Sequence, residues 1–443
     1  MNSKQFFLIF GPMLALFTYL FIDLPLPHEG KVVVAITVLA IVYWFSEAIA
    51  LHVTGLLISF LLIVTAGFSP KEIFPHYFNP VIVLLLGGFM LAVALQKYKL
   101  DHDIAHRSLN FLGSNPKKVL LGFMFLTAFL SFWISNTASA AVMIPIVLFI
   151  LAKNKLDIKN SNFSKAFILG VAYAATAGGI GTLVGSTPNP LAASAINDLG
   201  IKFGFFDWVF YGLPFVIVFL FVIWFVVLKI YNPEITELKI EKEKQSFSKQ
   251  EKMVLGIFGL TIFLWATDSI TGLHSSVVAL VPVLLLYFTG LVNTEDFKKI
   301  NWPILSLIGS GIVLGFSFQQ TGIDIFIASS IGILAVGQPL FVVMFVIAIV
   351  GVLVTMFASN TASAALMIPL SIPLAPVLGI KPEVLIVLTA IAASVDFTAP
   401  MGTPPNAIAY STGAIKVTEM ARTGLLLSLI ASLLLAVFAT FFW

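Results

Sequence analysis

Apolar runs of roughly 20 residues recur from one end of this chain to the other, and they constrain its fold more than any other feature. Each run is long enough to cross a hydrocarbon core ~30 Å thick as a helix. Of the 443 residues, 59% are hydrophobic and only 10% are charged. A soluble domain carries about 25% charged residues. The sequence therefore predicts an all-α polytopic membrane protein.

Eleven of the runs are interpreted as single crossings of the membrane. Two further runs do not have the length of a single crossing. The apolar stretches 119–151 and 339–379 are too long for one span and too short for two, and each contains Ser-Asn-Thr near its middle. We interpret both as re-entrant hairpins, because non-helical backbone is tolerated at membrane depth only inside protein or beside water. The predicted crossings are 5–24, 32–51, 52–68, 79–97, 166–197, 206–229, 253–268, 273–291, 302–320, 384–412 and 421–443.

The distribution of basic residues tests this topology. With the N-terminus in the cytoplasm, the 24 Lys and Arg residues all lie on the cytoplasmic side except Lys31, Lys71, Lys202 and Lys381. Such a bias is the positive-inside signal of a membrane protein. It also supports the first hairpin, because both flanks of that stretch are basic. We expect an inner-membrane protein whose C-terminus lies on the side opposite to the cytoplasm.

The chain contains an internal repeat. Residues 135–146 read SNTASAAVMIPI and residues 359–370 read SNTASAALMIPL, with ten of twelve positions identical. A second pair follows the hairpins, GSTPN at 185–189 and GTPPN at 402–406. Each of these prolines lies inside a long apolar segment, so we expect it to break its helix in the membrane.

In the predicted topology the first hairpin opens inside and the second opens outside, so the two repeats are inverted. Inverted repeats with paired broken helices are typical of secondary transporters. The alternative is a duplicated packing motif, because small residues allow helices to approach closely. Packing accounts for the alanines of the motif, but it does not account for an Asn and a Thr present in both copies.

The hairpin tips offer the chemistry of an anion site. Helix N-termini expose unpaired N–H groups and bind anions without a buried cation. The deep segments hold no Lys or Arg, and two such termini suit a substrate with two negative groups. Asn136 and Asn360 add amide donors, and Thr137 and Thr361 add hydroxyl donors.

A dianion in a low-dielectric site also needs positive charge, which sodium can supply. Ser131 precedes Ser135 by four residues, and Thr355 precedes Ser359 by four, so the repeat offers two oxygen-rich clusters. Unwound backbone and hydroxyl oxygens suit a hard cation. Each sodium ion driven inward gains about 2.3 kcal/mol per 100 mV. Two ions balance a dianion, and a third makes transport electrogenic.

Few features of the sequence indicate an enzyme. Cysteine is absent, which excludes disulfides, thiolate catalysis and cysteine-ligated metals. The six His residues fall near predicted loops or span ends, away from the tip serines, which leaves no base for an intramembrane hydrolase. We expect no enzyme activity, no prosthetic group and no nucleic-acid partner.

Asp396 is an intramembrane carboxylate just before the second break, and two interpretations of it remain open. As such residues are functional candidates, it carries a proton or helps to hold a cation. Alternatively, it accepts hydrogen bonds from nearby backbone or from Thr398 and positions the break. Its repeat counterpart, in the segment 177–180, is not acidic.

With the twin SNT tips, the GTPPN-type break and the two hairpins, the chain resembles the divalent anion/sodium symporters (DASS) over nearly its whole length. The resemblance implies that the tips contact substrate and sodium, with GSTPN departing from the pattern at the first break. The substrate residues it implies are Asn136, Thr137, Asn360, Thr361, Thr403 and Pro404. The first sodium site it implies is Ser131, Ser135, Asn136 and Gly185, and the second is Thr355, Ala358, Asn360 and Gly402.

The resemblance also implies a homodimer in which a transport domain moves against a scaffold like an elevator. The scaffold is then 1–115 and 253–335, the transport domain 116–229 and 336–443, and 230–252 is a cytoplasmic linker. The hairpins 119–151 and 339–379 and the broken helices 166–197 and 384–412 belong to the transport domain.

The expected function is sodium-coupled import of C4-dicarboxylates such as succinate, malate and fumarate. A sodium-independent dicarboxylate exchanger, and the same fold carrying sulfate or citrate, remain the alternatives.

Overall fold

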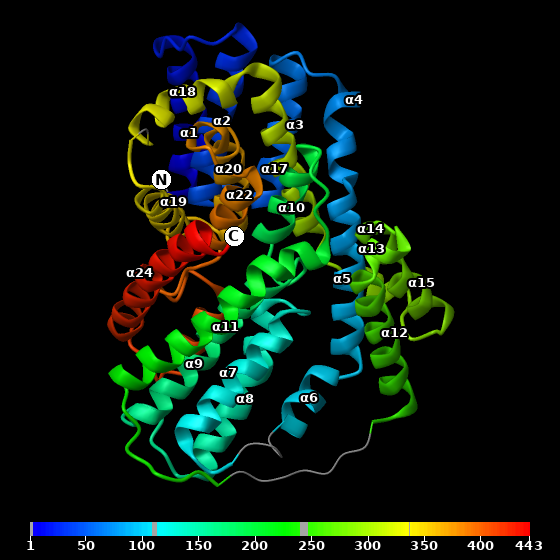
Figure 1. The fold of residues 1–443 in the computed structure, drawn as a ribbon, viewed down its shortest axis with the longest axis vertical. Helices are drawn as coiled ribbons and strands as arrows, with labels where there is room; N and C mark the ends of the chain where they lie inside the picture. The colour runs from blue at the N-terminus through cyan, green and yellow to red at the C-terminus, as the bar shows by residue number, and fades with distance from the viewer. Residues whose placement is uncertain (1–2, 109–112, 240–246, 336) are drawn as a thin grey trace.

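The computed structural model describes residues 3–108, 113–239, 247–335 and 337–443, and these residues form helices and turns without a strand (Figure 1). The prediction of an all-α fold is confirmed. The helices of the first half are α1 (Ser3–Phe21), α2 (His28–Ser46), α3 (Leu51–Thr65), α4 (Pro70–Ile73), η1 (Phe74–Phe78), α5 (Pro80–Lys97), α6 (Leu100–Ser108), α7 (Pro116–Ser131), α8 (Asn136–Lys153), α9 (Asn162–Gly178), η3 (Gly179–Gly181), α10 (Pro188–Asp198) and α11 (Phe205–Ile230).

The second half continues with α12 (Lys249–Ala266), α13 (Asp268–Thr271), α14 (Ser275–Val278), α15 (Leu280–Phe288), α16 (Thr294–Phe297), α17 (Trp302–Thr321), α18 (Ile323–Ala335), α19 (Leu340–Thr355), α20 (Asn360–Ser371), α21 (Leu374–Leu378), α22 (Pro382–Ala392), α23 (Pro404–Ser411) and α24 (Val417–Phe441). Among the described residues, eight helical segments are long and apolar enough to cross a membrane. The protein is therefore a multi-pass membrane protein.

The two repeats form two bundles of the same design. In the first, the hairpin α7–α8 packs against α9 and α11, and in the second, the hairpin α19–α20 packs against α22 and α24 (Figure 1). The long helices α11 and α24 join the bundles, with the rings of Phe215 and Phe438 in an edge-on contact at 5.8 Å. Helices α6 and α18 also occupy equivalent places, each directly after a long helix, α5 or α17.

Both broken helices are interrupted in mid-course. Between α9 and α10 the chain passes through η3 and the non-helical residues 182–187, and between α22 and α23 residues 393–403 are non-helical. Each new helix begins with proline at its first position, where a missing N–H costs no hydrogen bond. Helix α10 then packs against α20 and α22 of the second repeat, while α23 packs against α8 and α9 of the first. The two repeats are thus interlocked.

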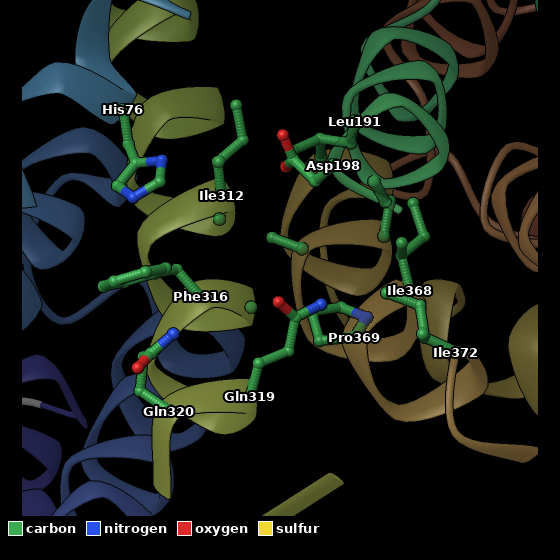
Figure 2. Close-up of a pocket in the computed structure, with 15 residues that line it drawn as sticks. His76, Leu191, Asp198, Ile312, Phe316, Gln319, Gln320, Ile368, Pro369 and Ile372 are labelled. Atoms are coloured by element: carbon green, nitrogen blue, oxygen red, sulfur yellow. The ribbon is translucent and has the colours of Figure 1, made fainter. Parts of the chain in front are cut away.

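The remaining helices pack against one another through small residues. A Cβ on Gly55 of α3 would lie 2.2 Å from Ser310 Oγ of α17, and one on Gly87 of α5 would lie 2.1 Å from the carbonyl oxygen of Ala279. Such close approach gives membrane helices their van der Waals contact. Helix α10 faces α17 across a cavity of about 250 Å³, with Asp198 and Leu191 on one wall and Phe316 and Gln319 on the other (Figure 2).

Helix α2 ends at Ser46, five residues before the predicted end of its crossing at residue 51. Glu47 adopts a left-handed conformation with φ of 46°, which stops the helix although the sequence stays apolar. The second arm of the second hairpin is also divided, into α20 and α21, with Pro373 directly before α21. Hydrophobicity alone does not reveal either interruption.

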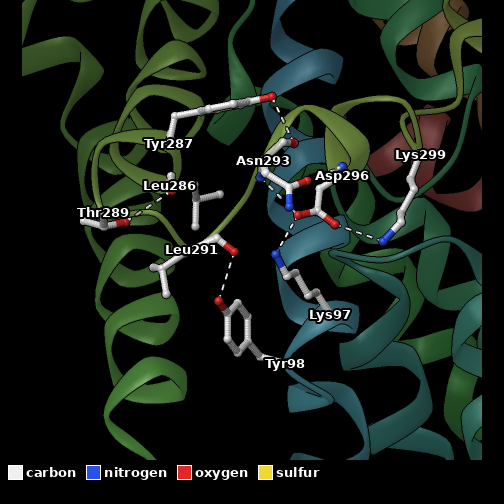
Figure 3. Close-up of polar contacts among 9 residues, drawn as sticks. All are labelled: Lys97, Tyr98, Leu286, Tyr287, Thr289, Leu291, Asn293, Asp296 and Lys299. Atoms are coloured by element: carbon white, nitrogen blue, oxygen red, sulfur yellow. Dashed lines mark hydrogen bonds and ion pairs between the residues drawn. The ribbon is translucent and has the colours of Figure 1, made fainter.

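A buried carboxylate ties the end of α5 to the loop before α17 (Figure 3). The side chain of Asp296 is 4% exposed and accepts hydrogen bonds from Lys97 Nζ at 2.6 Å and Lys299 Nζ at 2.9 Å. The backbone N–H of Asn293 donates a third bond at 3.1 Å. Burial raises the pKa of Asp296, but these donors outweigh it and hold the pKa at about 2, below the ordinary 3.8.

We predict that Asp296→Asn lowers the free energy of unfolding by ~2 kcal/mol near neutral pH, because it leaves two lysines without their partner. Since the folded pKa lies below 3.8, the carboxylate stabilises the protein fully above about pH 4 and loses this effect toward pH 2. Thermal unfolding midpoints of wild type and variant, measured from pH 7 to pH 3, should therefore converge as the pH falls.

Glu295→Gln is the matched control, because Glu295 pairs with Lys298 at the surface, where both side chains are exposed. Surface pairs contribute little, so this control should unfold like wild type. A deficit in Asp296→Asn that is unchanged at pH 3, or an equal deficit in Glu295→Gln, would contradict the assignment.

Candidate functional site

The two hairpin tips have the same local structure. In each, a serine caps the second arm from an extended conformation: Ser135 Oγ accepts from the N–H of Ala138 and Ser359 Oγ from that of Ala362, both at 3.2 Å. Serine is a preferred capping residue for this reason. The N-termini of α8 and α20 therefore lie at the tips, where their remaining N–H groups carry partial positive charge.

An oxygen cluster joins the first tip to the first broken helix. Ser131 Oγ donates to the carbonyl oxygen of Ala175 at 2.7 Å and also lies 2.7 Å from Asn136 Oδ1. The Asn136 side-chain atom at this place, whether it is the amide oxygen or the amide nitrogen, lies 3.3 Å from the carbonyl oxygens of Ala175 and Gly185. With its oxygen at this position, Asn136 faces only acceptors, a set that a cation satisfies. With its nitrogen there, the amide donates to them in place of the cation.

The second tip carries an equivalent cluster. Thr355 Oγ1 donates to the carbonyl oxygen of Ala393 at 2.8 Å and lies 2.9 Å from Asn360 Oδ1. Thr355 is fully buried, as is Ser131 in the first repeat. Each hydroxyl has one proton and two neighbouring acceptor oxygens, so each cluster holds more acceptors than donors when the asparagine oxygen faces it.

A buried asparagine holds each break in shape. Asn189 Nδ2 donates to the carbonyl oxygens of Gly179 at 2.8 Å and Thr182 at 2.7 Å, and Asn406 Nδ2 donates to that of Ala399 at 3.1 Å. Both side chains are fully buried. These bonds satisfy carbonyls that the interrupted helices leave free.

Hydrogen bonds between threonines connect the second tip and the second break to the first repeat. The hydroxyl of Thr361 at the second tip contacts that of Thr187 at the first break. The hydroxyl of Thr403 at the second break lies 3.4 Å from that of Thr176 on α9. Thr361 and Thr403 are 8% and 3% exposed, so these contacts are largely closed to solvent.

A second cavity, of about 220 Å³, reaches the first tip. On one side are Ser135 and the first break, and on the other are α5 and the start of α17. Its polar lining consists of Gln96, Ser135, Ser186, Thr187, Lys299 and Asn301. The cavity of Figure 2, by contrast, contains no tip residue.

The structure brings Ser131, Asn136 and Gly185 together, and likewise Thr355 and Asn360. Gly402 lies against Asp396 in the second break. The other residues singled out from the sequence are Thr137 and Pro404, which are exposed, and Ala358, which is half-buried.

Sequence reasoning did not find the carbonyls of Ala175 and Ala393, since backbone ligands leave no signal in side chains. It also did not single out Thr187 and Thr176. For Thr187 a signal existed, because it lies in the repeated Pro-Asn segment.

Comparison with known proteins shows the family of the chain. Residues 4–443 match the family described as the sodium:sulfate symporter transmembrane region. The chain belongs to this family of divalent anion/sodium symporters. It is accordingly a transporter and not an enzyme.

Several relatives cover most of the chain. A sodium-dependent dicarboxylate transporter of Staphylococcus saprophyticus is 33% identical, over 96% of this chain and 88% of the relative. An uncharacterised transporter of Haemophilus influenzae is 34% identical, over 94% and 93%. Among solved structures, the Alcanivorax borkumensis YdaH transporter covers 94% of this chain and 99% of its own at 15% identity, with a TM-score of 0.58. This last match shows likeness of fold alone.

We predict that Gly185→Ala abolishes most sodium-dependent uptake in proteoliposomes. A Cβ at Gly185 would lie 2.6 Å from the carbonyl oxygen of Gly179 and 2.8 Å from that of Ser131, so the oxygen cluster must open. Such overpacking costs about 1–3 kcal/mol. Gly256→Ala in α12 is the control, because no atom lies within 4 Å of its Cβ. Wild-type sodium dependence in Gly185→Ala would contradict this geometry.

Proposed function

We propose that this protein is a secondary active transporter that imports C4-dicarboxylates such as succinate, malate and fumarate together with sodium. The observation that carries the proposal is the pair of equivalent oxygen clusters, each beside a helix N-terminus at a hairpin tip. Relatives at 33% identity named as sodium-dependent dicarboxylate transporters support the same substrate class.

The anion is bound between the tips. The N-termini of α8 and α20 supply N–H groups and partial positive charge to its two carboxylates. This arrangement needs no buried lysine, which agrees with the absence of Lys and Arg from these segments. The side chains that complete the site are Asn136, Thr137, Asn360 and Thr361, together with Thr403 and Pro404 of the second break.

Sodium occupies the two oxygen clusters. The first ion is held by Ser131, Ser135, Asn136 and Gly185 with the Ala175 carbonyl, and the second by Thr355, Ala358, Asn360 and Gly402 with the Ala393 carbonyl. Oxygen ligands of this kind suit a hard cation. Asn136 and Asn360 belong to both the cation and the anion sites. A bound cation fixes the amide oxygen toward the cluster, which leaves the amide nitrogen free to donate to substrate, and this couples the two ligands.

Transport occurs by movement of the bundles as an elevator against a scaffold in a homodimer. The mobile part comprises the hairpins, the broken helices, α11 and α24, and the scaffold comprises residues 1–115 and 253–335. The lining of the cavity at the first tip includes Gln96 and Lys299, which lie at the predicted cytoplasmic side. We infer that the structure represents the inward-facing state of an inner-membrane protein whose N-terminus is cytoplasmic.

A second candidate carries sulfate instead, because the description of the matching family names sodium and sulfate. Sulfate is also a dianion, so the same helix N-termini and cation clusters serve it. Citrate and sodium-independent dicarboxylate exchange remain further outcomes of the experiment below.

The test is uptake of radiolabelled succinate into proteoliposomes with sodium or choline outside, each with and without succinate inside. We expect uptake that needs the sodium gradient and no internal substrate. Each inward sodium gains about 2.3 kcal/mol per 100 mV, so a cotransported third ion makes uptake increase with an inside-negative potential. Uptake that needs internal dicarboxylate and ignores sodium would establish exchange. Sodium-driven uptake of sulfate or citrate, but not succinate, would establish a different substrate.

A further inference from the structure

Asp396 is a buried carboxylate with one satisfied and one unsatisfied oxygen. It lies in the non-helical segment between α22 and α23 and is fully buried. Oδ1 accepts from the N–H of Thr398 at 3.1 Å and from Thr398 Oγ1 at 2.9 Å. Oδ2 is buried without a hydrogen-bond partner, and no ion pair to Asp396 occurs within the part of the chain that the structure describes. A carboxylate in such a place requires a compensating partner.

Asp396 Oδ2 lies against Gly402 in the second break, and the equivalent glycine of the first break is Gly185. A Cβ on Gly402 of the second break would lie 2.0 Å from Asp396 Oδ2. On Gly185 of the first break it would lie 2.6 Å from the carbonyl oxygen of Gly179 and 2.8 Å from that of Ser131. The unpartnered carboxylate oxygen thus lies against the second glycine where backbone carbonyl oxygens lie against the first.

Asp396 has no acidic counterpart in the first repeat. Ala175 and Ala393 have the same role as carbonyl acceptors in the two clusters. The residue three positions after Ala393 is Asp396, and the residue three positions after Ala175 is Gly178, which has no side chain. The two cation clusters are therefore equivalent in their hydroxyl, amide and carbonyl oxygens, but a formal negative charge accompanies only the second.

We propose that Asp396 Oδ2 is a ligand of the sodium ion in the second cluster. This inference rests on the proposed function, since it assigns one more ligand to a cation site of that transporter. A carboxylate is a preferred ligand of hard cations, and ligand charge strengthens their binding. The second site is charge-neutral once sodium binds, even without substrate. The first site has only neutral ligands, so its cation is compensated by the dianion. The second site accordingly fills first.

Two substitutions separate this role from a purely structural one. In Asp396→Asn the side-chain oxygen still accepts both bonds from Thr398, so the turn is kept while the charge is lost. In Thr398→Val the hydroxyl donor is lost while the carboxylate remains. A residue that only positions the break would be affected by both changes, and a cation ligand chiefly by the first.

The experiment measures the thermal unfolding midpoint of purified protein as sodium chloride replaces choline chloride at constant ionic strength, without substrate. In wild type we expect sodium to raise the midpoint. In Asp396→Asn the sodium concentration for half of this effect should rise about tenfold or more, whereas in Thr398→Val it should change less than about threefold. Sodium dependence of uptake in proteoliposomes should shift in the same order.

The inference is overturned if Asp396→Asn responds to sodium like wild type, or if Thr398→Val reproduces its shift. Asp396→Ser provides a second neutral variant in case the first does not fold, because its hydroxyl can still accept from the N–H of Thr398. A wild type whose midpoint and uptake both ignore sodium would overturn the proposed function itself. A wild type that responds to sodium, with variants that respond equally, would overturn only the role of Asp396.

Discussion

Backbone groups freed by the two helix breaks have no water to bind at membrane depth, and the rest of this structure depends on how they are satisfied. Asn189 and Asn406 donate to carbonyls inside the breaks, while Ser131 and Thr355 donate to carbonyls at the ends of α9 and α22. These partners leave other carbonyl and amide oxygens facing one another. A broken helix that is stabilised in this way provides the oxygen-rich surroundings that a hard cation requires.

The interlocking of the repeats places both clusters in one structural unit. Helix α10 of the first repeat packs against α20 and α22 of the second, and α23 packs against α8 and α9. The pair Thr187 and Thr361 joins the first break to the second tip. The second tip is thus held partly by the first repeat. The two oxygen clusters are therefore connected through packed helices and hydrogen bonds, an arrangement that suits the proposed movement of the bundles as one body.

Much of this organisation was predictable because it rests on pattern. Apolar runs predicted the all-helical membrane fold, and the repeated SNT segments predicted two equivalent hairpin tips with helix N-termini, but the capping roles of Ser135 and Ser359 came from the structure. The carbonyls of Ala175 and Ala393 were not predictable, since any residue can supply a carbonyl and only the packing of α7 on α9 and α19 on α22 selects these. The end of α2 depended on the left-handed Glu47, which hydrophobicity does not report. For Asp396 the sequence left two roles open. The hydrogen bonds from Thr398 agree with a role in positioning the break, and the unpartnered Oδ2 beside Gly402 is the observation behind the proposed role as a cation ligand.

Counting bound ions decides whether the two tip clusters are cation sites. Equilibrium dialysis of the purified protein against radioactive sodium, with saturating succinate, gives the number of ions per chain. We expect at least two ions, and we expect Ser131→Ala and Thr355→Val each to remove one at sodium concentrations that saturate wild type. One ion or none in folded wild-type protein, or unchanged binding in both variants, would contradict this expectation.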